Sequence, residues 1–425
     1  MQLALPARGV CSHALAAVLV MAASAAAAAA ADWPQFRGPG GRARSDEKGV
    51  PVTWGRDQNI AWRVKLPAPG NSSPIVSNGR VFITGAEDEG RTRTLASFSA
   101  DDGSLVWSKS VRYEERERTH DTNPHGAATP AADGERVVAW HGTAGLYCYD
   151  FDGHELWQAD LGRAGHMWGI GSSPIIHDGR VFLNFGPGDR SFVVALDLES
   201  GTVLWRVEEP GGDDDKYIGS WSTPVIADID GRTQVVCSMP ARVVGYEPAS
   251  GEILWTLGGL SGPGGDLMYT SLLISGDRAV VMAGFRGPAA AFKLGGTGDV
   301  TETNLLWKTE GPQPQRIGSG AIVGRHVYMA NADVGTAQCF DLETGDVLWE
   351  ERLGRGGAFW ATTVFAGGNL YATNQQGTTI VFRPDPQKLD IVASNEMDER
   401  TNATPAFANR RVYLRTFEAL YCIAE

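Results

Sequence analysis

Imidazole and carboxylate side chains gather in the first half of the chain, at His120, Asp121, His125 and His166. Groups of this kind can bind a metal ion or exchange protons. Their spacing matches no common metal-ligand motif, and the first three share one loop. We therefore predict no metal site here and treat the four residues as candidate ligand-binding groups.

A second set of candidates combines aromatic and cationic side chains. Aromatic faces can stack on planar or sugar-like rings, and an arginine can bind an acidic group or a peptide. The members of this set are Trp168, Trp221, Tyr269, Arg316, Trp360 and Arg400. The alternative is that these side chains only pack against neighbouring strands or border a water-filled opening.

Sequence motifs for catalysis are absent. The chain contains no Gly-x-Ser-x-Gly, no His-Glu-x-x-His and no glycine-rich loop followed by a phosphate-binding lysine. We therefore predict no catalytic residue.

The candidates precede the copies of a repeat. Each copy begins with a tripeptide of mostly small residues, which we call the lead-in, and continues with an apolar run, a tight turn and a second apolar run. The lead-ins start at Ser72, Ala128, Ser172, Ser222, Thr270, Gly318, Ala361 and Ala403. A period of roughly 40–50 residues indicates stacked units that bury each other's apolar faces.

Turn signals inside the repeat indicate β-structure. Asn78-Gly79 and Asp178-Gly179 separate apolar runs, as in two-residue hairpin turns. Four short strands in each of eight copies predict an all-β fold, an eight-bladed β-propeller with four antiparallel strands per blade. The loops before the innermost strands of a propeller open on one face around the axis, so the candidate residues are expected to converge there.

The last copy lacks a fourth strand, because the chain ends two residues after Ile423. A strand-like segment without a lead-in lies at residues 59–64 instead. Pairing of this N-terminal strand with the last blade would close the ring and remove the open sheet edges. We predict this closure.

Most copies end with Gly-x-x-x-Trp, most clearly from Ala195 to Trp205. This pattern resembles the tryptophan-docking repeat of the PQQ-like (quinoprotein alcohol dehydrogenase-like) β-propellers, which include the BamB-like propellers of outer-membrane assembly. The resemblance covers roughly residues 59–425, and the start at Asp32 is similar to that of secreted bacterial members. It implies a structural girdle of docking tryptophans at Trp62, Trp107, Trp157, Trp205, Trp255, Trp307 and Trp349.

The resemblance also raises the question of a cofactor. Quinone-dependent members hold pyrroloquinoline quinone (PQQ) in the central funnel between a tryptophan and a disulfide of adjacent cysteines, with Ca²⁺ on carboxylate and amide groups. This sequence has no Cys-Cys pair, and its funnel loops contain no acidic cluster that aligns with the Ca²⁺ ligands. We expect the scaffold without the redox site, and no cofactor.

Composition and the N-terminal segment indicate an extracytoplasmic protein. Residues 1–31 hold one arginine, an alanine-dominated apolar stretch and no acidic residue, which is typical of a cleaved signal peptide. Residues 32–58 form an N-terminal extension, and residues 59–425 the propeller. No lipid-attachment cysteine follows the apolar stretch. A net charge of −13 without basic runs argues against nucleic-acid binding.

Two hypotheses follow for the function. The first, which we favour, is a non-catalytic periplasmic or secreted scaffold that presents its funnel face to a protein, peptide or glycan partner. The second is a PQQ-dependent oxidoreductase with an atypical site.

Overall fold

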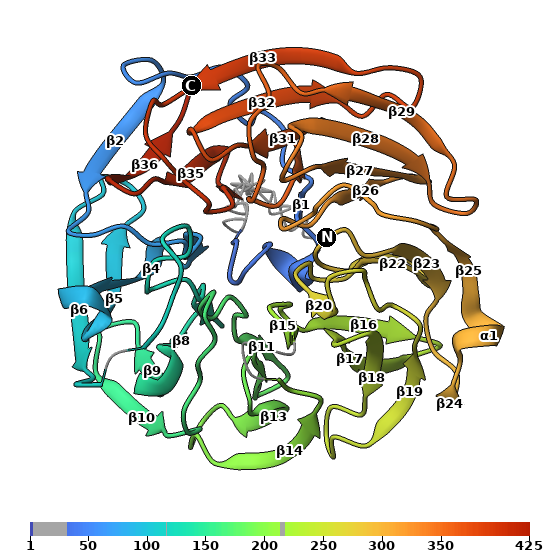
Figure 1. Ribbon diagram of the computed structural model, residues 1–425. Coiled ribbons are helices and arrows are strands. Elements are labelled where there is room, and N and C mark those ends of the chain that lie inside the picture. Colours follow the sequence, from blue (N-terminus) through green and yellow to red (C-terminus); the bar gives the residue numbers. More distant parts are fainter. Residues whose placement is uncertain (3–31, 116, 213–216) are drawn as a thin grey trace.

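The computed structural model describes residues 1–2, 32–115, 117–212 and 217–425. The segment expected to be a signal peptide lies almost wholly outside the described residues. Eight sheets surround a central axis, as Figure 1 shows, so the predicted eight-bladed propeller is confirmed. No helix within the described ranges is both long and apolar enough to cross a bilayer.

Each blade consists of four antiparallel strands; in the first seven blades they follow one another outward from the axis in chain order, and in the eighth the outermost strand is the N-terminal β2. The strands of the first four blades are β3 (Ile75–Ser77), β4 (Arg80–Glu87), β5 (Thr92–Ser99), β6 (Leu105–Arg112); β7 (Ala131–Ala132), β8 (Arg136–Trp140), β9 (Leu146–Asp150), β10 (Glu155–Ala159); β11 (Ile175–His177), β12 (Arg180–Phe185), β13 (Ser191–Asp197), β14 (Val203–Glu209); and β16 (Val225–Ile229), β17 (Arg232–Met239), β18 (Arg242–Tyr246), β19 (Ile253–Leu257).

The last four blades follow the same plan. Their strands are β21 (Leu273–Ser275), β22 (Arg278–Met282), β23 (Ala289–Lys293), β25 (Leu305–Lys308); β26 (Ala321–Val323), β27 (His326–Ala330), β28 (Thr336–Asp341), β29 (Val347–Arg352); β30 (Val364–Ala366), β31 (Asn369–Thr373), β32 (Thr378–Arg383), β33 (Asp390–Glu396); and β34 (Ala406–Ala408), β35 (Arg411–Arg415), β36 (Ala419–Ile423), β2 (Ile60–Lys65).

A few short elements lie outside this plan. They are β1 (Arg44–Ser45), β15 (Ile218–Ser220), β20 (Asp266–Met268), β24 (Gly298–Asp299), α1 (Thr301–Asn304) and the 3₁₀ turns η1 (Pro39–Gly41), η2 (Asp88–Gly90) and η3 (Gly142–Ala144). The parallel pair β15–β20 joins the loops that lead into the fourth and fifth blades.

The hairpin turns adopt the backbone that their residues favour. Asn78 and Gly79 both have positive φ angles, 45° and 74°, as a two-residue turn between twisted strands requires. The turn brings Val81 and Phe82 of β4 opposite Val76 and Ile75 of β3, and all four side chains are fully buried. The repeated turn signal thus sets the register that places each blade's apolar residues in the core.

The N-terminal strand closes the ring. Strand β2 pairs antiparallel with β36, and Trp62 lies opposite Cys422, which confirms the predicted closure. A buried carboxylate reinforces it: Glu399 accepts hydrogen bonds from the Tyr421 hydroxyl at 2.6 Å and from Arg63 of β2 at 3.0 Å. The two ends of the chain are therefore held together by both backbone and side-chain contacts.

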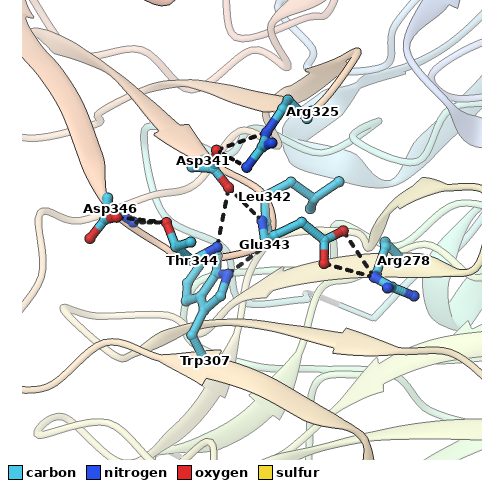
Figure 2. A network of polar contacts seen from close by, with 8 residues as sticks. All are labelled: Arg278, Trp307, Arg325, Asp341, Leu342, Glu343, Thr344 and Asp346. Atoms are coloured by element: carbon cyan, nitrogen blue, oxygen red, sulfur yellow. Dashed lines mark hydrogen bonds and ion pairs between the residues drawn. The ribbon is translucent and has the colours of Figure 1, made fainter.

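The outer tryptophans connect neighbouring blades. Six of them donate their indole N–H to a backbone carbonyl in the turn before the next blade's outer strand, at 2.8–3.1 Å. Figure 2 shows this contact for Trp307, whose indole N–H donates to the Leu342 carbonyl. In the same turn the Asp341 carboxylate accepts hydrogen bonds from the backbone N–H groups of Glu343 and Thr344. The repeated glycine lies against the ring: a Cβ at Gly251, whose φ is +75°, would lie 2.7 Å from Trp205.

Trp255 differs from the other members of the girdle. Its indole N–H donates to Gln234 within its own blade at 2.7 Å, while its ring contacts Phe292 of the fifth blade. The next blade has a longer turn here, and β24 from that turn pairs with β19 directly. At this position a strand pair thus takes the place of the indole hydrogen bond that the other six tryptophans make to the next blade.

A ring of hydrogen bonds connects the blades close to the axis. In seven lead-ins the backbone N–H of the middle residue donates to the side-chain hydroxyl of the middle residue in the next blade, at 2.9–3.1 Å. Between the sixth and seventh blades the N–H of Thr363 donates to the Ser319 carbonyl instead. The recurrent serine and threonine of the lead-ins therefore fasten each blade to its neighbour.

Residues 33–45, which we call the axial segment, cross the centre of the ring (Figure 1). Trp33 exchanges two backbone hydrogen bonds with Val76 of the first blade, and β1 pairs parallel with β30 of the seventh. Between these contacts, buried Arg37 donates to the Leu272 carbonyl of the fifth blade at 2.9 Å. The extension thus packs against the innermost strands before it reaches β2.

Candidate functional site

A cavity of ≈ 360 Å³ lies at the axis, on the face where the lead-in loops converge. Phe36 of the axial segment contributes to its lining from the side of the innermost strands, and every blade contributes a loop side chain. In blade order these loop residues are Asn71, His120, Trp168, Trp221, Tyr269, Gln315, Trp360 and Asn402. The volume falls within the range of about 300–1,000 Å³ that is common for small-ligand sites.

The side-chain hydroxyls of the middle lead-in residues, which we call the hydroxyl ring, form the deeper part of the lining. Seven of the eight middle lead-in residues border the cavity: Ser73, Thr129, Ser173, Ser271, Ser319, Thr362 and Thr404. Each is at most 4% exposed. Where the oxygen accepts a backbone N–H from the preceding blade, the hydroxyl proton remains available for another acceptor. The cavity therefore presents converging hydroxyl groups below its aromatic opening.

Aromatic residues from three consecutive blades form one wall. The ring of Trp168 lies 5.9 Å from that of Trp221, and Tyr269 lies 5.3 Å from Trp221 in an edge-to-face contact. The indole N–H of Trp221 donates to the Gly169 carbonyl at 2.9 Å. These contacts hold the wall in place without a ligand. Burial raises the pKa of Tyr269, so its hydroxyl stays protonated.

Trp360 lies on the other side of the axis. It comes from the seventh blade, which is opposite the third in a ring of eight, and it is partly exposed. No aromatic contact or hydrogen bond from its side chain occurs within the described ranges. A flat ligand in the cavity could therefore contact Trp168 on one side and Trp360 on the other.

Amide side chains brace the opening between the eighth, first and second blades. Asn71 donates to Asn123 at 2.9 Å, and Asn402 donates to the Thr122 carbonyl at 2.7 Å. Asn123 donates in turn to the Trp168 and Ile170 carbonyls, both at 2.8 Å. Because these donors are occupied, the amides mainly fix the shape of the opening.

Five of the ten predicted ligand-binding residues line the cavity: His120, Trp168, Trp221, Tyr269 and Trp360. The imidazole of His120 is exposed, and its Nδ1 lies 2.8 Å from the Thr122 hydroxyl. The structure thus brings together the aromatic candidates and one histidine.

The other imidazole and carboxylate candidates lie away from the cavity. Asp121 is exposed in the same loop as His120. His125 borders a separate, very small pocket that Glu117 also lines. His166 is buried behind the aromatic wall, with its ring 5.1 Å from that of Trp221. Within the described ranges no three metal-ligating side chains come together.

Both candidate arginines also lie outside the lining. Arg316 is 2% exposed and donates to Gln338 of β28 at 2.8 Å, and burial lowers its pKa to about 10. Arg400 is exposed and lies over the ring of Phe417, 5.3 Å from its centre. Neither guanidinium is placed to bind an acidic ligand in the cavity.

Sequence reasoning missed several lining residues. Phe36 arrives from the axial segment, and Phe285 comes from the loop between β22 and β23. That loop opens on the same face as the lead-in loops, so the hairpin pattern itself could have pointed to Phe285. The hydroxyl ring was missed because the lead-ins were interpreted only as small residues.

The lining does not fit PQQ with Ca²⁺. PQQ is a tricarboxylate, and burying it requires cationic partners, whereas Ca²⁺ requires carboxylate ligands. The described lining residues include no lysine, arginine, aspartate or glutamate. The free cysteines at Cys148, Cys237, Cys339 and Cys422 are buried in blade strands, and burial raises their thiol pKa values.

Comparisons with known proteins agree on the scaffold. A family profile described as outer membrane protein assembly factor BamB matches residues 44–124 and 91–351. BamB from Moraxella catarrhalis is similar in structure, with a TM-score of 0.59, 14% identity and coverage of 85% of this chain and 96% of that chain. A search of curated protein sequences found no match.

Dehydrogenase structures are also similar. A europium-containing methanol dehydrogenase gives a TM-score of 0.69 with 10% identity, covering 93% of this chain and 98% of that one. The quinohemoprotein alcohol dehydrogenase from Comamonas testosteroni gives 0.68 with 12% identity, covering 92% and 80%. At these identities the likeness shows the fold alone. Because the family profile covers more than half of the sequence, this chain belongs to the PQQ-like β-propeller family described as outer membrane protein assembly factor BamB.

Proposed function

We propose that this chain is a non-catalytic binding propeller of the cell envelope, periplasmic or secreted, which receives a protein, peptide or glycan partner at the axial cavity. The observation that carries the proposal is the lining. All eight blades contribute to it, aromatic faces and hydroxyl groups dominate it, and His120 and Tyr269 are the titratable side chains among its described residues. Such a cavity suits binding more than chemistry.

The described residues of the lining include no paired acid and base, which supports the non-catalytic role. A general base normally needs a partner that orients it or tunes its pKa. The Nδ1 atom of His120 contacts the hydroxyl and the backbone N–H of Thr122, and among the described residues no carboxylate lies within hydrogen-bonding distance of it. We infer that His120 contributes to binding.

Location and partner class rest on two further supports. The N-terminal 31 residues have the composition of a signal peptide. The matching family profile is described as an outer membrane protein assembly factor, which supports an envelope location and a protein partner. Mass-spectrometric identification of the mature N-terminus would test the first support, with cleavage close to Ala31 as the expected result.

The function is tested by affinity capture from an extracytoplasmic fraction. The wild-type protein is compared with a cavity variant, Trp168→Ala with Trp360→Ala, and with Arg400→Ala as a matched change near the opening but outside the lining. We expect one or more envelope components to be captured by the wild type and by Arg400→Ala, and to be lost with the cavity variant. Capture that does not depend on the cavity residues would contradict the proposal.

The alternative, a PQQ-dependent oxidoreductase with an atypical site, needs a separate test. Purified protein is mixed with PQQ and Ca²⁺, and we measure retained quinone absorbance and dye-linked oxidation of alcohols or sugars. We expect neither, because the described lining lacks partners for the carboxylates of PQQ and for Ca²⁺. The appearance of both would replace the binding function with catalysis.

A further inference from the structure

We propose that the cavity binds an uncharged saccharide ring, as the end of a glycan, between Trp360 and the wall formed by Trp168, Trp221 and Tyr269. This inference rests on the proposed function, because it takes the axial cavity as the binding site and specifies its ligand. Its grounds are the opposed aromatic faces, the available hydrogen-bond donors, the lack of charge and the closed inner end.

The aromatic residues are arranged on opposite sides of the axis. Trp168 belongs to the third blade and Trp360 to the seventh, and these blades face each other across a ring of eight. Trp221 is fixed by its hydrogen bond to Gly169, and Tyr269 contacts it edge to face. A pyranose ring has apolar C–H faces that stack on aromatic side chains while its hydroxyl groups point sideways.

Hydrogen-bond donors remain available around such a ring. The indole N–H groups of Trp168 and Trp360 and the hydroxyl of Tyr269 have no hydrogen-bond partner among the residues that the structure describes. Below them, hydroxyls such as those of Thr129 and Thr404 accept a backbone N–H and keep their own proton. Sugar hydroxyl oxygens are suitable acceptors for all of these donors.

Charge distinguishes a neutral sugar from an acidic ligand. The described lining has no formally charged side chain except on protonation of His120, and Arg316 and Arg400 both lie outside it. An ionised ligand would lose its hydration without gaining a partner, which is costly. The cavity therefore favours an uncharged ligand over a uronic acid or PQQ.

The closed inner end favours a terminal group over an extended chain. Phe36 borders the cavity from the axial segment, which crosses the ring at the innermost strands. A volume of ≈ 360 Å³ is small for a site of this kind. An extended peptide would need a groove that is open at both ends and backbone groups along it, whereas the tip of a glycan needs one opening.

The test uses matched sugars and matched variants. The full mature protein is examined by saturation-transfer NMR and tryptophan fluorescence with the methyl glycosides of glucose, galactose, mannose and N-acetylglucosamine and their disaccharides. Methyl glucuronide and methyl galacturonide are the charged counterparts. We expect at least one neutral sugar to bind and its uronide to bind about ten-fold more weakly. Trp360→Ala should weaken binding about ten-fold and Trp360→Phe less than that, because phenylalanine keeps the ring face and loses only the indole N–H. Arg400→Ala, which lies outside the lining, should leave binding unchanged.

The results separate this inference from the proposed function. If no neutral sugar binds, if uronides bind as tightly, or if Trp360→Ala binds like the wild type, the saccharide inference is wrong. Cavity-dependent capture of a protein or peptide would in that case still support a binding propeller. Unchanged melting temperatures of the variants show that any loss of binding arises at the site and not from unfolding.

Discussion

Trp205 and Trp360 are the same residue type in two contrasting regions of the molecule. Trp205 belongs to the outer girdle, is 8% exposed, and donates its indole N–H to the Pro248 carbonyl of the next blade at 2.9 Å. Trp360 faces the cavity, is partly exposed and makes no hydrogen bond from its side chain within the described ranges. One indole holds two blades together, while the other leaves its face and its N–H available.

Position relative to the repeat accounts for the contrast. Trp205 occurs at the recurrent place in the repeat, four residues after Gly201, and lies against Gly251 of the following copy. Trp360 directly precedes a lead-in, as Trp221 and Tyr269 do, whereas His120 lies eight residues before the lead-in that follows it. The recurrent positions of the repeat make the contacts between blades, whereas the irregular loops before the lead-ins line the cavity.

The largest effect is expected from removing a girdle tryptophan. Trp205→Ala should lower the free energy of unfolding by about 3–5 kcal/mol, because it empties a buried site and removes the bond to Pro248. Urea denaturation followed by circular dichroism measures this change. Trp205→Phe keeps most of the ring and serves as the matched control. A loss below about 1 kcal/mol for the alanine variant would show that the girdle is not what joins the blades.

The closure of the ring should depend on pH through Glu399. Burial would raise the pKa of Glu399, but hydrogen bonds from Thr416, Tyr421 and Arg63 together hold the pKa below its usual value of 4.5. A carboxylate with a lowered pKa in the folded state stabilises the protein above pH 4.5. That stabilisation is lost as the pH falls through the folded-state pKa.

Glu399→Gln should therefore destabilise the protein by about 2–3 kcal/mol at pH 7 and by progressively less toward pH 3. Urea denaturation at several pH values measures the difference. Glu396→Gln is the control, because Glu396 is exposed and its only ion pair among the described residues is with the exposed Arg355, at 3.7 Å. If Glu399→Gln lost the same free energy of unfolding at pH 7 and at pH 3, the charge of Glu399 would not help to hold the chain ends together.

Removing one hydrogen bond of the hydroxyl ring should lower stability by a smaller amount. Thr129→Val keeps the shape of the side chain but removes the hydroxyl that accepts the buried N–H of Ser73 at 2.9 Å. An unpaired buried N–H costs about 1–2 kcal/mol, whereas Thr129→Ser keeps the acceptor. Thermal unfolding of the two variants compares them directly. If both variants melt alike, the hydroxyl hydrogen bond contributes little to joining the blades.

The fold could be predicted because the information is local and repeated. Turn pairs such as Asn78-Gly79 and the recurrent lead-ins define strands, and eight copies define the ring. The axial segment could not be placed in this way. The apolar character of Trp33 and Phe36 indicates burial, but Arg37 bonds to Leu272, 235 residues away, and no local pattern specifies that partner.

The position of the candidate site could be predicted from the sequence, but only part of the residues that line it could be. The rule that loops before innermost strands face the axis correctly brings Trp168 and Trp360 into one cavity. It does not give side-chain direction, since an irregular loop has no period. Arg316 lies two residues before its lead-in, close to the position that Trp360 has in the next copy, yet its side chain turns back to Gln338.

The smallest effect on stability is expected at the cavity itself. Trp360→Ala should change the free energy of unfolding by less than about 1 kcal/mol, since the side chain is partly exposed and outside the repeat. Trp221→Ala should cost more, because it also breaks the bond to Gly169 that joins two lead-in loops. Thermal unfolding of both variants beside Trp205→Ala tests the order. If Trp360→Ala destabilised the protein as much as Trp205→Ala, the indole of Trp360 would have to be assigned to packing between blades. An indole that contributes little to the stability of the fold is instead available to bind a ligand.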